Sequence, residues 1–378
     1  MKDAQKIREW SKNKLPAGVS KYLLTHLPTF ESSSNYPYAV TRVRAMRMKL
    51  FPRDTYPRFL NMSLDEITLK IGESEYKQDI DALSQEYSGV NLIEHALNRN
   101  MAESFQKILR ITEGELRDLI AEYLRIFDIR DIKTILRGKL HNIPEAQILE
   151  SLVTGGMLRY TFLSSLATKS VDEIIAALND SLYAPILKKY DGTNLQDIEN
   201  ELDKFYYENL FAEIGFTGSS DRRQFDQFVR REVDIQNLSL LLRVKKYDGG
   251  ESGNCSIENI ASMLIPDGLY LDPVQLQKLC YDDFVNALRS TPYWEVIGPT
   301  LEKNQNIGSV SLTEIESRLL RFNLKKATAN SRMFLISIIP ILEFIIYKSN
   351  EVRNLRIIVR GKSSGMDNNL IKDRLVIL

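Results

Sequence analysis

Three pairs of neighbouring acidic residues are the first places where this sequence could perform chemistry. They are Asp65-Glu66, Asp172-Glu173 and Asp282-Asp283. Two adjacent carboxyl groups can serve as general acid and general base in catalysis. The first two pairs, however, begin two positions after a serine, which is typical of a helix N-terminus with its cap and acidic first turn. We therefore predict that these acids are first-turn residues and not a catalytic pair.

Two glycine-containing segments resemble fragments of catalytic motifs. Gly361-Lys362-Ser363 matches the end of a phosphate-binding P-loop, but that motif needs a glycine where this sequence has Arg356. The segment from Gly250 to Gly253 is one residue short of a nucleophile elbow and lies in a predicted linker. Neither segment predicts an enzyme, so we expect no catalytic residues.

Cysteine and histidine are too scarce for a disulfide framework or a zinc site. The two cysteines fit a chain that works in a reducing cytoplasm. The three histidines are widely separated and have no zinc-ligand spacing with the cysteines. We therefore expect no metal and no cofactor. The residues concerned are Cys255, Cys280, His26, His95 and His141.

Composition excludes two further classes of protein. The 378 residues carry 50 basic and 50 acidic side chains, and this zero net charge argues against a nucleic-acid binder. The longest apolar stretch, Met333 to Tyr347, is broken by polar residues and is too short to cross a bilayer. We predict that this stretch is a core helix kinked at Pro340, in a soluble protein without a secretory signal.

Internal repetition is the strongest signal in the sequence, because four features recur three times in the same order. The acidic pair is followed by a tyrosine, eleven positions after its first residue. An Ile-Glu-x-x-Leu motif comes next, and a closing motif with an acid nine positions before an arginine comes last. The tyrosines are Tyr76, Tyr183 and Tyr293; the glutamates are Glu94, Glu199 and Glu316; the closing motifs are Asp128…Arg137, Asp234…Arg243 and Glu351…Arg360.

Helical periodicity on both sides of a break predicts the second half of each unit. The breaks fall at Gly114, at Gly215 with Gly218, and at Asn330-Ser331. Two antiparallel helices of about 20 residues, each about 30 Å long, are expected there. Thr112 and Glu115 have the spacing of a capping box for the second helix. Hairpin and strand patterns are scarce, so we predict an all-α fold.

The closing motif fits a helix that buries one side and has basic residues at its C-terminal end. The sequence leaves open whether its acids start that helix or lie in the middle of a longer one, where they would need buried partners. The predicted buried stripe is Ile129, Ile132, Leu136, Ile235, Leu238, Leu242, Val352, Leu355 and Val359.

Three units of about 110 residues exceed the usual solenoid periods, so each is large enough to own a core. Only short junctions separate them, which favours a compact body of three packed units over separate beads. We predict an N-terminal extension over 1–34 and repeat units over 35–144, 145–255 and 256–378.

The combined motifs resemble the C subunit of the archaeal A-type ATP synthase and the related d subunit of V-type ATPases. The likeness runs from about Asn35 to the C-terminus. It is carried by the segment from Tyr36 to Leu50, by Asp131 to Lys139, by Asp234 to Leu238 and by Val352 to Lys362. Residues 1–34 precede the point at which this resemblance begins.

This resemblance implies a fold and a role. Three similar helical lobes would form a funnel with pseudo-threefold symmetry, which receives the central axle and sits on the membrane rotor ring. The protein would transmit torque for proton or sodium translocation without catalysis of its own. It would lie at the cytoplasmic face of the membrane, bind no nucleic acid and form no homo-oligomer. The alternative is a free-standing helical scaffold or adaptor with the same triplicated fold.

Two groups of basic residues are candidates for partner contact. The first lies at equivalent helix ends and would form a basic ring in a threefold body; the alternative is that these residues cap helices and form salt bridges between lobes. The second lies on one predicted helix, where a solvated face is the alternative and nucleic-acid contact ranks last. The groups are Arg137, Lys139, Arg243, Lys245, Arg360 and Lys362, and then Arg42, Arg44 and Arg47.

Overall fold

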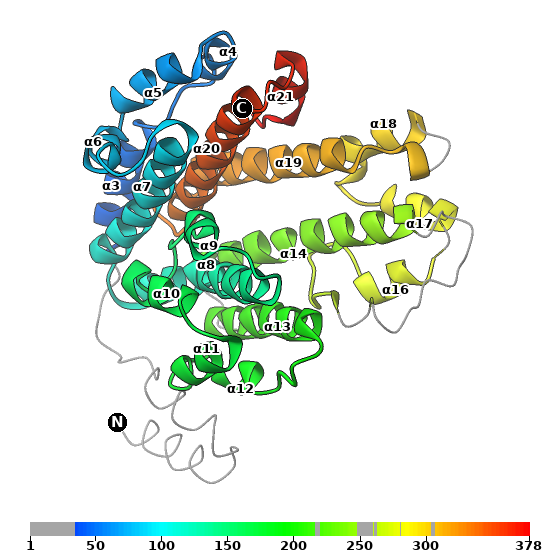
Figure 1. The fold of residues 1–378 in the computed structure, drawn as a ribbon. Helices are drawn as coiled ribbons and strands as arrows, with labels where there is room; N and C mark the ends of the chain where they lie inside the picture. Colours follow the sequence, from blue (N-terminus) through cyan, green and yellow to red (C-terminus); the bar gives the residue numbers. More distant parts are fainter. Residues whose placement is uncertain (1–34, 216–219, 248–259, 261–262, 280, 304–306) are drawn as a thin grey trace.

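The computed structural model describes residues 35–215, 220–247, 260, 263–279, 281–303 and 307–378. Regular structure in these residues is helical throughout, which confirms the all-α prediction (Figure 1). The predicted extension over 1–34, the unit boundary at residue 255 and the linker from Gly249 to Gly253 lie outside the described residues.

Each unit consists of several short helices followed by two long ones, and in the third unit one more short helix comes last. The first unit contains α3 (Tyr36–Arg47), α4 (Thr55–Phe59), α5 (Leu64–Gly72), α6 (Lys77–Leu83), α7 (Gly89–Ile111) and α8 (Gly114–Leu140). The second contains α9 (Glu145–Ser151), α10 (Tyr160–Ala167), α11 (Val171–Ala177), α12 (Ala184–Leu187), α13 (Leu195–Ile214) and α14 (Ser220–Tyr247). The third contains α16 (Pro273–Gln277), α17 (Tyr281–Leu288), α18 (Trp294–Lys303), η1 (Ile307–Ser309), α19 (Leu312–Met333), α20 (Ile339–Ser363) and α21 (Asn368–Arg374).

The acidic pairs lie in the first turns of short helices, as predicted. Ser63 and Glu66 form a reciprocal capping box at the start of α5, and Ser170 with Glu173 does the same at α11. The third pair lies in the first turn of α17. Glu66 and Glu173 thus accept backbone N–H groups, and all three pairs lie where their charge complements the helix dipole.

The capping box predicted for Thr112 and Glu115 is wrong. Thr112 ends α7 and its hydroxyl donates to the carbonyl of Ile108 at 2.9 Å, so Glu113 becomes the N-cap of α8. Glu115 instead forms an ion pair with Arg222 of α14 at 2.6 Å.

The prediction of a helix kinked at Pro340 is also wrong. Helix α20 begins at Ile339, and Pro340 occupies its first turn, where a proline costs no hydrogen bond. The preceding residues form the α19–α20 turn, and Met333, Leu335 and Ile336 are exposed there. Only the part of the apolar stretch from Ile338 onward enters the core.

The closing motifs lie within the long helices α8, α14 and α20, which run unbroken through the three acids. The predicted stripe is buried apart from Ile235, which is partly exposed. Gly138 and Gly361 near the ends of two of these helices allow close packing, because a Cβ atom would lie 2.6 Å from Ile148 and 2.7 Å from Ile371.

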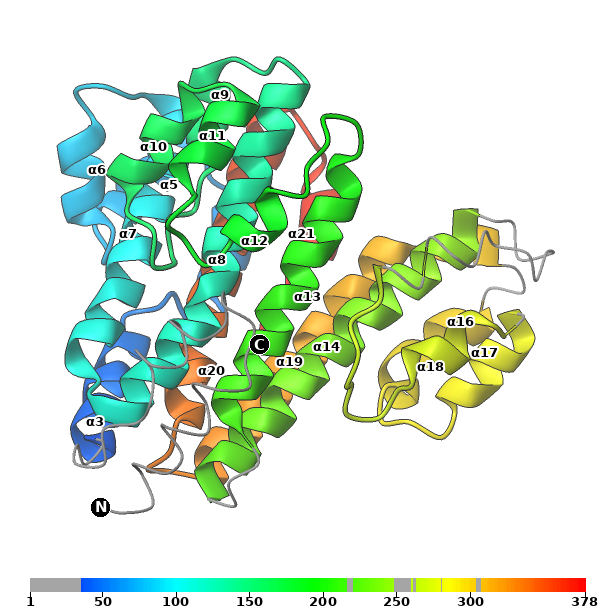
Figure 2. The same cartoon turned by 90° about the horizontal axis from the view of Figure 1, so that it is seen from below.

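The long helices pack across the unit boundaries. Helix α8 packs on α13, α14 packs on α19, and α20 at the end of the chain packs on α7 near its start. Figures 1 and 2 show α20 lying beside α7 and α3, and α14 running alongside α19. Each closing helix therefore completes the next unit, and the third unit is joined to the first.

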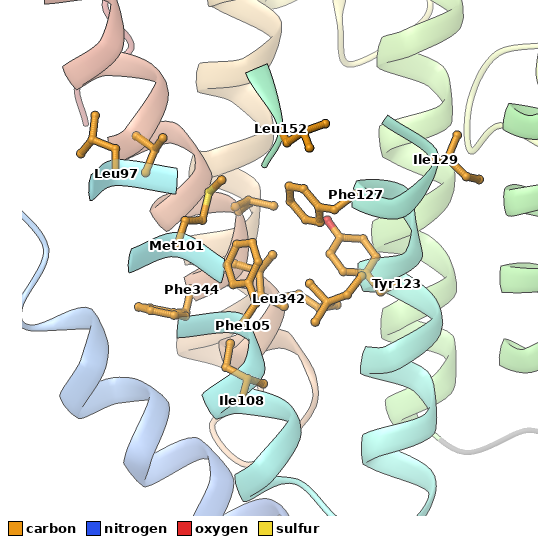
Figure 3. Close-up of a cluster of buried hydrophobic side chains, with 14 of the residues drawn as sticks. Leu97, Met101, Phe105, Ile108, Tyr123, Phe127, Ile129, Leu152, Leu342 and Phe344 are labelled. Carbon is orange, nitrogen blue, oxygen red and sulfur yellow. The ribbon is translucent and has the colours of Figure 1, made fainter. Parts of the chain in front are cut away.

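A large hydrophobic core fills the space between the long helices where they converge (Figure 3). Phe105 of α7 and Phe127 of α8 meet there with ring centroids 5.1 Å apart. Tyr123 of α8 faces Phe225 and Phe228 of α14 with centroid separations of 6.1 and 5.9 Å. Large aromatic rings thus fill the space between α7 and α8 and between α8 and α14.

The α7–α8 turn, the start of α14 and the α19–α20 turn are linked to one another at one end of the molecule. Besides the pair between Arg222 and Glu115, the Asp221 carboxylate accepts the Ile338 N–H at 3.0 Å. We call this end the turn end. Buried apolar residues close it, among them Ile108, Leu119, Ile214, Phe225, Ile338 and Leu342.

The third group of short helices, α16 to α18, has a core of its own. This core joins the second half of α14 to the first half of α19, and Figure 2 shows the group standing apart from the first two. Among the described residues, no helix is long and apolar enough to span a membrane.

Candidate partner-binding site

A buried carboxylate joins the first unit to the second. Asp128 in the middle of α8 is fully buried and accepts the N–H groups of Met157 and Leu158 at 3.0 and 2.9 Å. The Tyr183 hydroxyl, from the tyrosine of the second unit, donates to the same carboxylate at 3.0 Å. Burial raises the pKa of Asp128, and these three donors oppose the rise.

The same junction recurs twice more with different residues. Asp234 accepts the Tyr293 hydroxyl at 2.8 Å and the Tyr270 N–H at 2.8 Å. Glu351 of the third unit accepts the Tyr76 hydroxyl and the Phe51 N–H, each at 2.6 Å. The acid of each unit therefore binds the tyrosine of the next, and the third binds the first. This resolves the open choice: the acids lie mid-helix and have buried partners.

A basic residue three positions before each acid was not recognised in the sequence. These residues are Arg125, Arg231 and Lys348. Lys348 is fully buried, and its Nζ lies 2.8 Å from the Tyr76 hydroxyl and 3.2 Å from Glu351. Burial lowers the pKa of Lys348, and the Glu351 carboxylate counteracts this. The threefold recurrence of a base at this spacing was the signal that could have found them.

One helical turn after each buried acid, a second polar side chain forms hydrogen bonds with the backbone of a following segment. Asp131 accepts the N–H groups of Val153 and Thr154, both at 2.8 Å. Asn237 and Asn354 exchange paired hydrogen bonds with the backbone of Ile265 and Val376 in the same way. These contacts hold the chain segment that follows each long helix against that helix.

The three predicted arginines form ion pairs between units. Arg137 binds Glu199 at 2.5 Å and Arg243 binds Glu316 at 2.8 Å, while Arg360 binds Glu94 at the junction of the third unit with the first. Each arginine side chain is more than half exposed. The arginine of one unit thus reaches the Ile-Glu-x-x-Leu motif of the next.

The predicted lysines have different environments. Lys245 is buried and donates to the carbonyl of Leu279 at 2.6 Å, and Lys362 donates to the carbonyl of Leu60. Lys139 is partly exposed. Both hydrogen bonds join one unit to the next, so two of the three lysines help to hold the units together.

The second predicted group lies on α3, near the turn end. Arg47 forms an ion pair with Glu343 at 2.8 Å and lies over the Tyr347 ring. Arg44 donates to the carbonyl of Leu335 at 3.1 Å, and Arg42 is exposed. This group is therefore partly used to fix α3 against α20 and the α19–α20 turn.

All six long helices border one central cavity of about 610 Å³. Four arginines and one carboxylate line it, together with apolar and aromatic side chains. Of the predicted basic ring, only Arg360 is among the described residues that line this cavity. The charged lining residues are Arg130, Arg353, Arg356, Arg360 and Glu232.

Two cavity arginines retain unused hydrogen-bonding capacity. Among the described residues, the buried Nη1 of Arg353 and Nε of Arg356 have no hydrogen-bond partner. Burial lowers the pKa of both guanidinium groups. A buried donor without a partner is costly, so a carboxylate that entered the cavity would be stabilised there. Both residues lie inside the third closing motif, but the motif does not show that they face a cavity, because that depends on the convergence of the helices.

Glu232 is the single acid in the cavity lining described by the structure. Tyr123 donates to it at 3.1 Å and Asn323 at 3.4 Å. Burial raises the pKa of Glu232 to about 7, although Tyr123 and the nearby Arg231 and Arg130 oppose the rise. Among the described residues, no cluster of three or more His, Cys, Asp or Glu side chains could hold a metal ion.

Comparison with known proteins agrees with the resemblance. Residues 39–374 match the family model described as ATP synthase (C/AC39) subunit. The C subunit of the A-type ATP synthase of Methanosarcina acetivorans is 51% identical over 349 residues, which cover 92% of this chain and 94% of that protein. The corresponding C subunits of Methanosarcina mazei and Archaeoglobus fulgidus are 51% and 30% identical, over 92% and 91% of this chain and 94% and 96% of their own lengths. This chain therefore belongs to the ATP synthase C/AC39 subunit family.

Proposed function

We propose that the chain is a non-catalytic central-stalk subunit of a rotary A/V-type ATP synthase. In this role it couples the central axle to the membrane rotor ring and transmits torque for proton or sodium translocation. It works as a peripheral subunit at the cytoplasmic face of the membrane, as one copy per complex. Membership of the family and the relatives named as C subunits of A-type ATP synthases support this role.

The observation that carries the proposal is the central cavity lined by all six long helices. Its lining is basic, and it holds buried arginine donors that lack partners among the described residues. Buried apolar residues close the turn end, so an axle would enter from the opposite side. We infer that the cavity receives an acidic axle end, whose carboxylates pair with Arg353 and Arg356.

A coupling body must resist twisting, and the junctions supply that stiffness. Three buried carboxylate–tyrosine contacts and three Arg–Glu pairs link each unit to the next and the third to the first. We propose that these links hold the lobes in a closed, pseudo-threefold funnel around the cavity. Such a body transmits rotation because close-packed helices deform little.

In this proposal, the basic residues predicted from the sequence contribute less to partner binding than the cavity arginines do. Arg360 borders the cavity, whereas the side chains of Arg137 and Arg243, which do not line it, are more than half exposed at the other two junctions. Because these arginines also hold the units together, reversing their charge would change folding and binding at once. The cavity arginines give a cleaner test.

Binding of the purified axle subunits to this chain tests the cavity. Arg353→Glu with Arg130→Glu should weaken axle binding at least tenfold, since both arginines face the cavity. The control Lys188→Glu makes the same type of charge change on the exposed α12 end and should bind the axle normally. Unchanged axle binding by the cavity variant would contradict the proposed role of the cavity.

Coupling in the cell tests the role as a whole. Deletion of the chain should leave ATP hydrolysis by the soluble catalytic part intact and abolish ion pumping by membranes. The isolated chain should hydrolyse no ATP. Membranes that still pump ions without the chain would contradict the coupling function.

A further inference from the structure

The central cavity has the size and the lining of a site for a small ligand. Its volume of about 610 Å³ falls within the range of pockets that hold small molecules. Aromatic and apolar side chains form much of its wall, and Figure 3 shows Met101 of α7 with Tyr123 and Phe127 of α8 pointing toward one another there. A charged group set in such a wall interacts more strongly than it does in open solvent.

A row of three arginines runs along one face of α20 in this cavity. Arg353, Arg356 and Arg360 all line it, and Arg360 lies seven positions after Arg353, which corresponds to about 10 Å of helix. Burial lowers the pKa of Arg356 and the charge of Arg360 lowers it further, while Glu94 opposes both. A row of like charges is stabilised when negative charge lies beside it.

The protein supplies little of that negative charge. Glu94 pairs with Arg360, but Arg356 donates to the neutral side-chain oxygen of Asn98. Among the described residues, the buried Nη1 of Arg353 and Nε of Arg356 have no hydrogen-bond partner. These two guanidinium groups therefore keep donors for a ligand that carries several acceptor oxygens.

The other charged groups of the cavity add one more cation and a carboxyl group that is only partly charged. Arg130 of α8 also lines the cavity, and the Cζ atom of its guanidinium lies 5.3 Å from the centre of the Phe127 ring. Glu232 accepts hydrogen bonds from Tyr123 and Asn323, and burial raises its pKa to about 7. The cavity lining described by the structure therefore has an excess of positive charge near neutral pH.

A diphosphate group matches this arrangement better than a single carboxylate does. A carboxylate has one charge and two oxygens, which suffice for one bidentate contact with one guanidinium. Two linked phosphates carry several charges and acceptor oxygens in a small body, so they can contact neighbouring arginines of the row at once. Arginine suits this ligand because the planar fork of its donors contacts two phosphate oxygens together.

A second basic hollow, of about 1150 Å³, lies between α18, α19 and α21. Arg321, Lys325 and Arg374 line it and are exposed, and the exposed carboxylates of Glu295 and Asp373 belong to the same lining. Solvent and these acids screen the basic residues there. The hollow is therefore a weaker anion site than the cavity, and it provides the control for the test.

We propose that the central cavity of the free chain binds a small compound with a diphosphate group, held by Arg353 and Arg356 of α20 and by Arg130 of α8. This ligand and an acidic axle end use the same arginines, so each excludes the other. The competition rests on the proposed function, whereas the anion site rests on the cavity alone. The ligand neutralises the cavity before assembly, and the axle displaces it.

Isothermal titration calorimetry of inorganic pyrophosphate into the purified full-length chain, without axle subunits, tests the site. We expect saturable binding of one pyrophosphate per chain. Arg353→Gln with Arg356→Gln should weaken this binding at least tenfold. The control Arg321→Gln with Lys325→Gln removes the same charge from the exposed face of α19 and should bind pyrophosphate normally. If the cavity double variant fails to fold, Arg130→Gln at an exposed side chain keeps the test available and should also weaken binding.

Two further measurements define the ligand. Pyrophosphate should raise the midpoint of thermal unfolding of the wild-type chain and of the control, because a ligand of the folded state stabilises it, but not that of the cavity double variant. Inorganic phosphate should bind at least tenfold more weakly than pyrophosphate, because one phosphate reaches fewer arginines. Equal binding of the two anions would contradict the diphosphate class.

The remaining outcomes separate the anion site from the proposed function. A wild-type chain without saturable pyrophosphate binding would overturn the site. Loss of binding in the α19 control and not in the cavity variants would place the anion in the other hollow. Pyrophosphate should also lower the binding of purified axle subunits, and a chain that binds both at once would contradict the competition. A wild-type chain that binds pyrophosphate but no axle would contradict the proposed function and leave the anion site intact.

Discussion

Single residues at the junctions are the most sensitive points of the molecule. Asp128→Ala leaves two partly buried N–H groups and the Tyr183 hydroxyl without an acceptor, and should lower the free energy of unfolding by about 3–5 kcal/mol. Tyr183→Phe removes one hydrogen bond from a carboxylate that keeps two others, and should cost about 1–2 kcal/mol. Urea unfolding followed by circular dichroism measures both values.

The control for this series is Asp172→Ala, which removes an exposed first-turn acid. It should change the free energy of unfolding by about 0.5 kcal/mol or less. Equal unfolding midpoints for Asp128→Ala and Asp172→Ala would contradict the structural role assigned to the buried acid.

The raised pKa of Glu232 leads us to predict that the stability of the chain depends on pH. Its pKa is raised from 4.5 to about 7, so between these values the folded chain holds a proton that the unfolded chain has released. The free energy of unfolding should therefore fall as pH rises through this window, by about 3 kcal/mol for this group. Asp131, whose pKa burial also raises to about 7, acts in the same direction.

Thermal unfolding between about pH 4.5 and 8 checks this effect. Glu232→Gln keeps the shape and the hydrogen-bonding capacity of the side chain but cannot titrate, so its stability should vary less with pH. Glu208→Gln on the exposed face of α13 should leave the wild-type pH dependence intact. Parallel pH profiles for the Glu232→Gln variant and the wild-type chain would exclude a titrating carboxyl group in the cavity.

Residue types and spacing identified much of the junctions but not their pairing. The acids, tyrosines, glutamates and arginines all stood out as repeat features. A repeat, however, cannot show whether Asp128 binds the tyrosine of its own unit or Tyr183 of the next. Glu232 belongs to no repeat feature, and Arg353 lies inside the third closing motif without any local sign that it faces a cavity, so only the folded chain shows that both line it.

At the scale of elements, the closure of α20 onto α7 is held by the pair of Arg360 with Glu94. The Glu94 side chain is only 8% exposed, whereas Glu316 in the equivalent pair with Arg243 is 39% exposed. A partly buried pair is screened less by solvent. A double-mutant cycle should therefore give a larger coupling energy for Arg360–Glu94, about 1–3 kcal/mol, than for Arg243–Glu316, about 0.5 kcal/mol.

The cycle uses Arg→Met and Glu→Gln substitutions at each pair, with chemical denaturation as the readout. These replacements keep most of the side-chain volume and remove the charges. A coupling energy for Arg243–Glu316 equal to or above that for Arg360–Glu94 would mean that burial does not set the strength of these contacts.

The start of a helix was predictable where contacts between neighbouring residues determine it. The prediction was wrong where packing against distant parts of the chain determines which residues are helical. Serine–glutamate spacing located the starts of α5 and α11 because a capping box is a local contact. The apolar run from Met333 to Tyr347 has the composition of a core helix, but its first residues form an exposed turn. Composition cannot tell an apolar residue of the core from an apolar residue that is exposed in a turn.

At the scale of the whole molecule, the three repeat units pack against one another and form one connected body. The large core spans the first two units and extends along α20 to α21 in the third unit, while the third group of short helices keeps a separate core. The sequence predicted three helical units and short junctions. It could not predict that the last helix of each unit completes the next, because that arrangement depends on long-range packing of α8, α14 and α20.

The central claim is that the chain binds the axle and the rotor ring simultaneously, with the axle in the central cavity. Mass photometry of purified ring, chain and axle in detergent tests it most directly. The account predicts a complex with one chain and one axle on each ring, and no ring–axle complex without the chain. Displacement of the chain from the ring by added axle would contradict it.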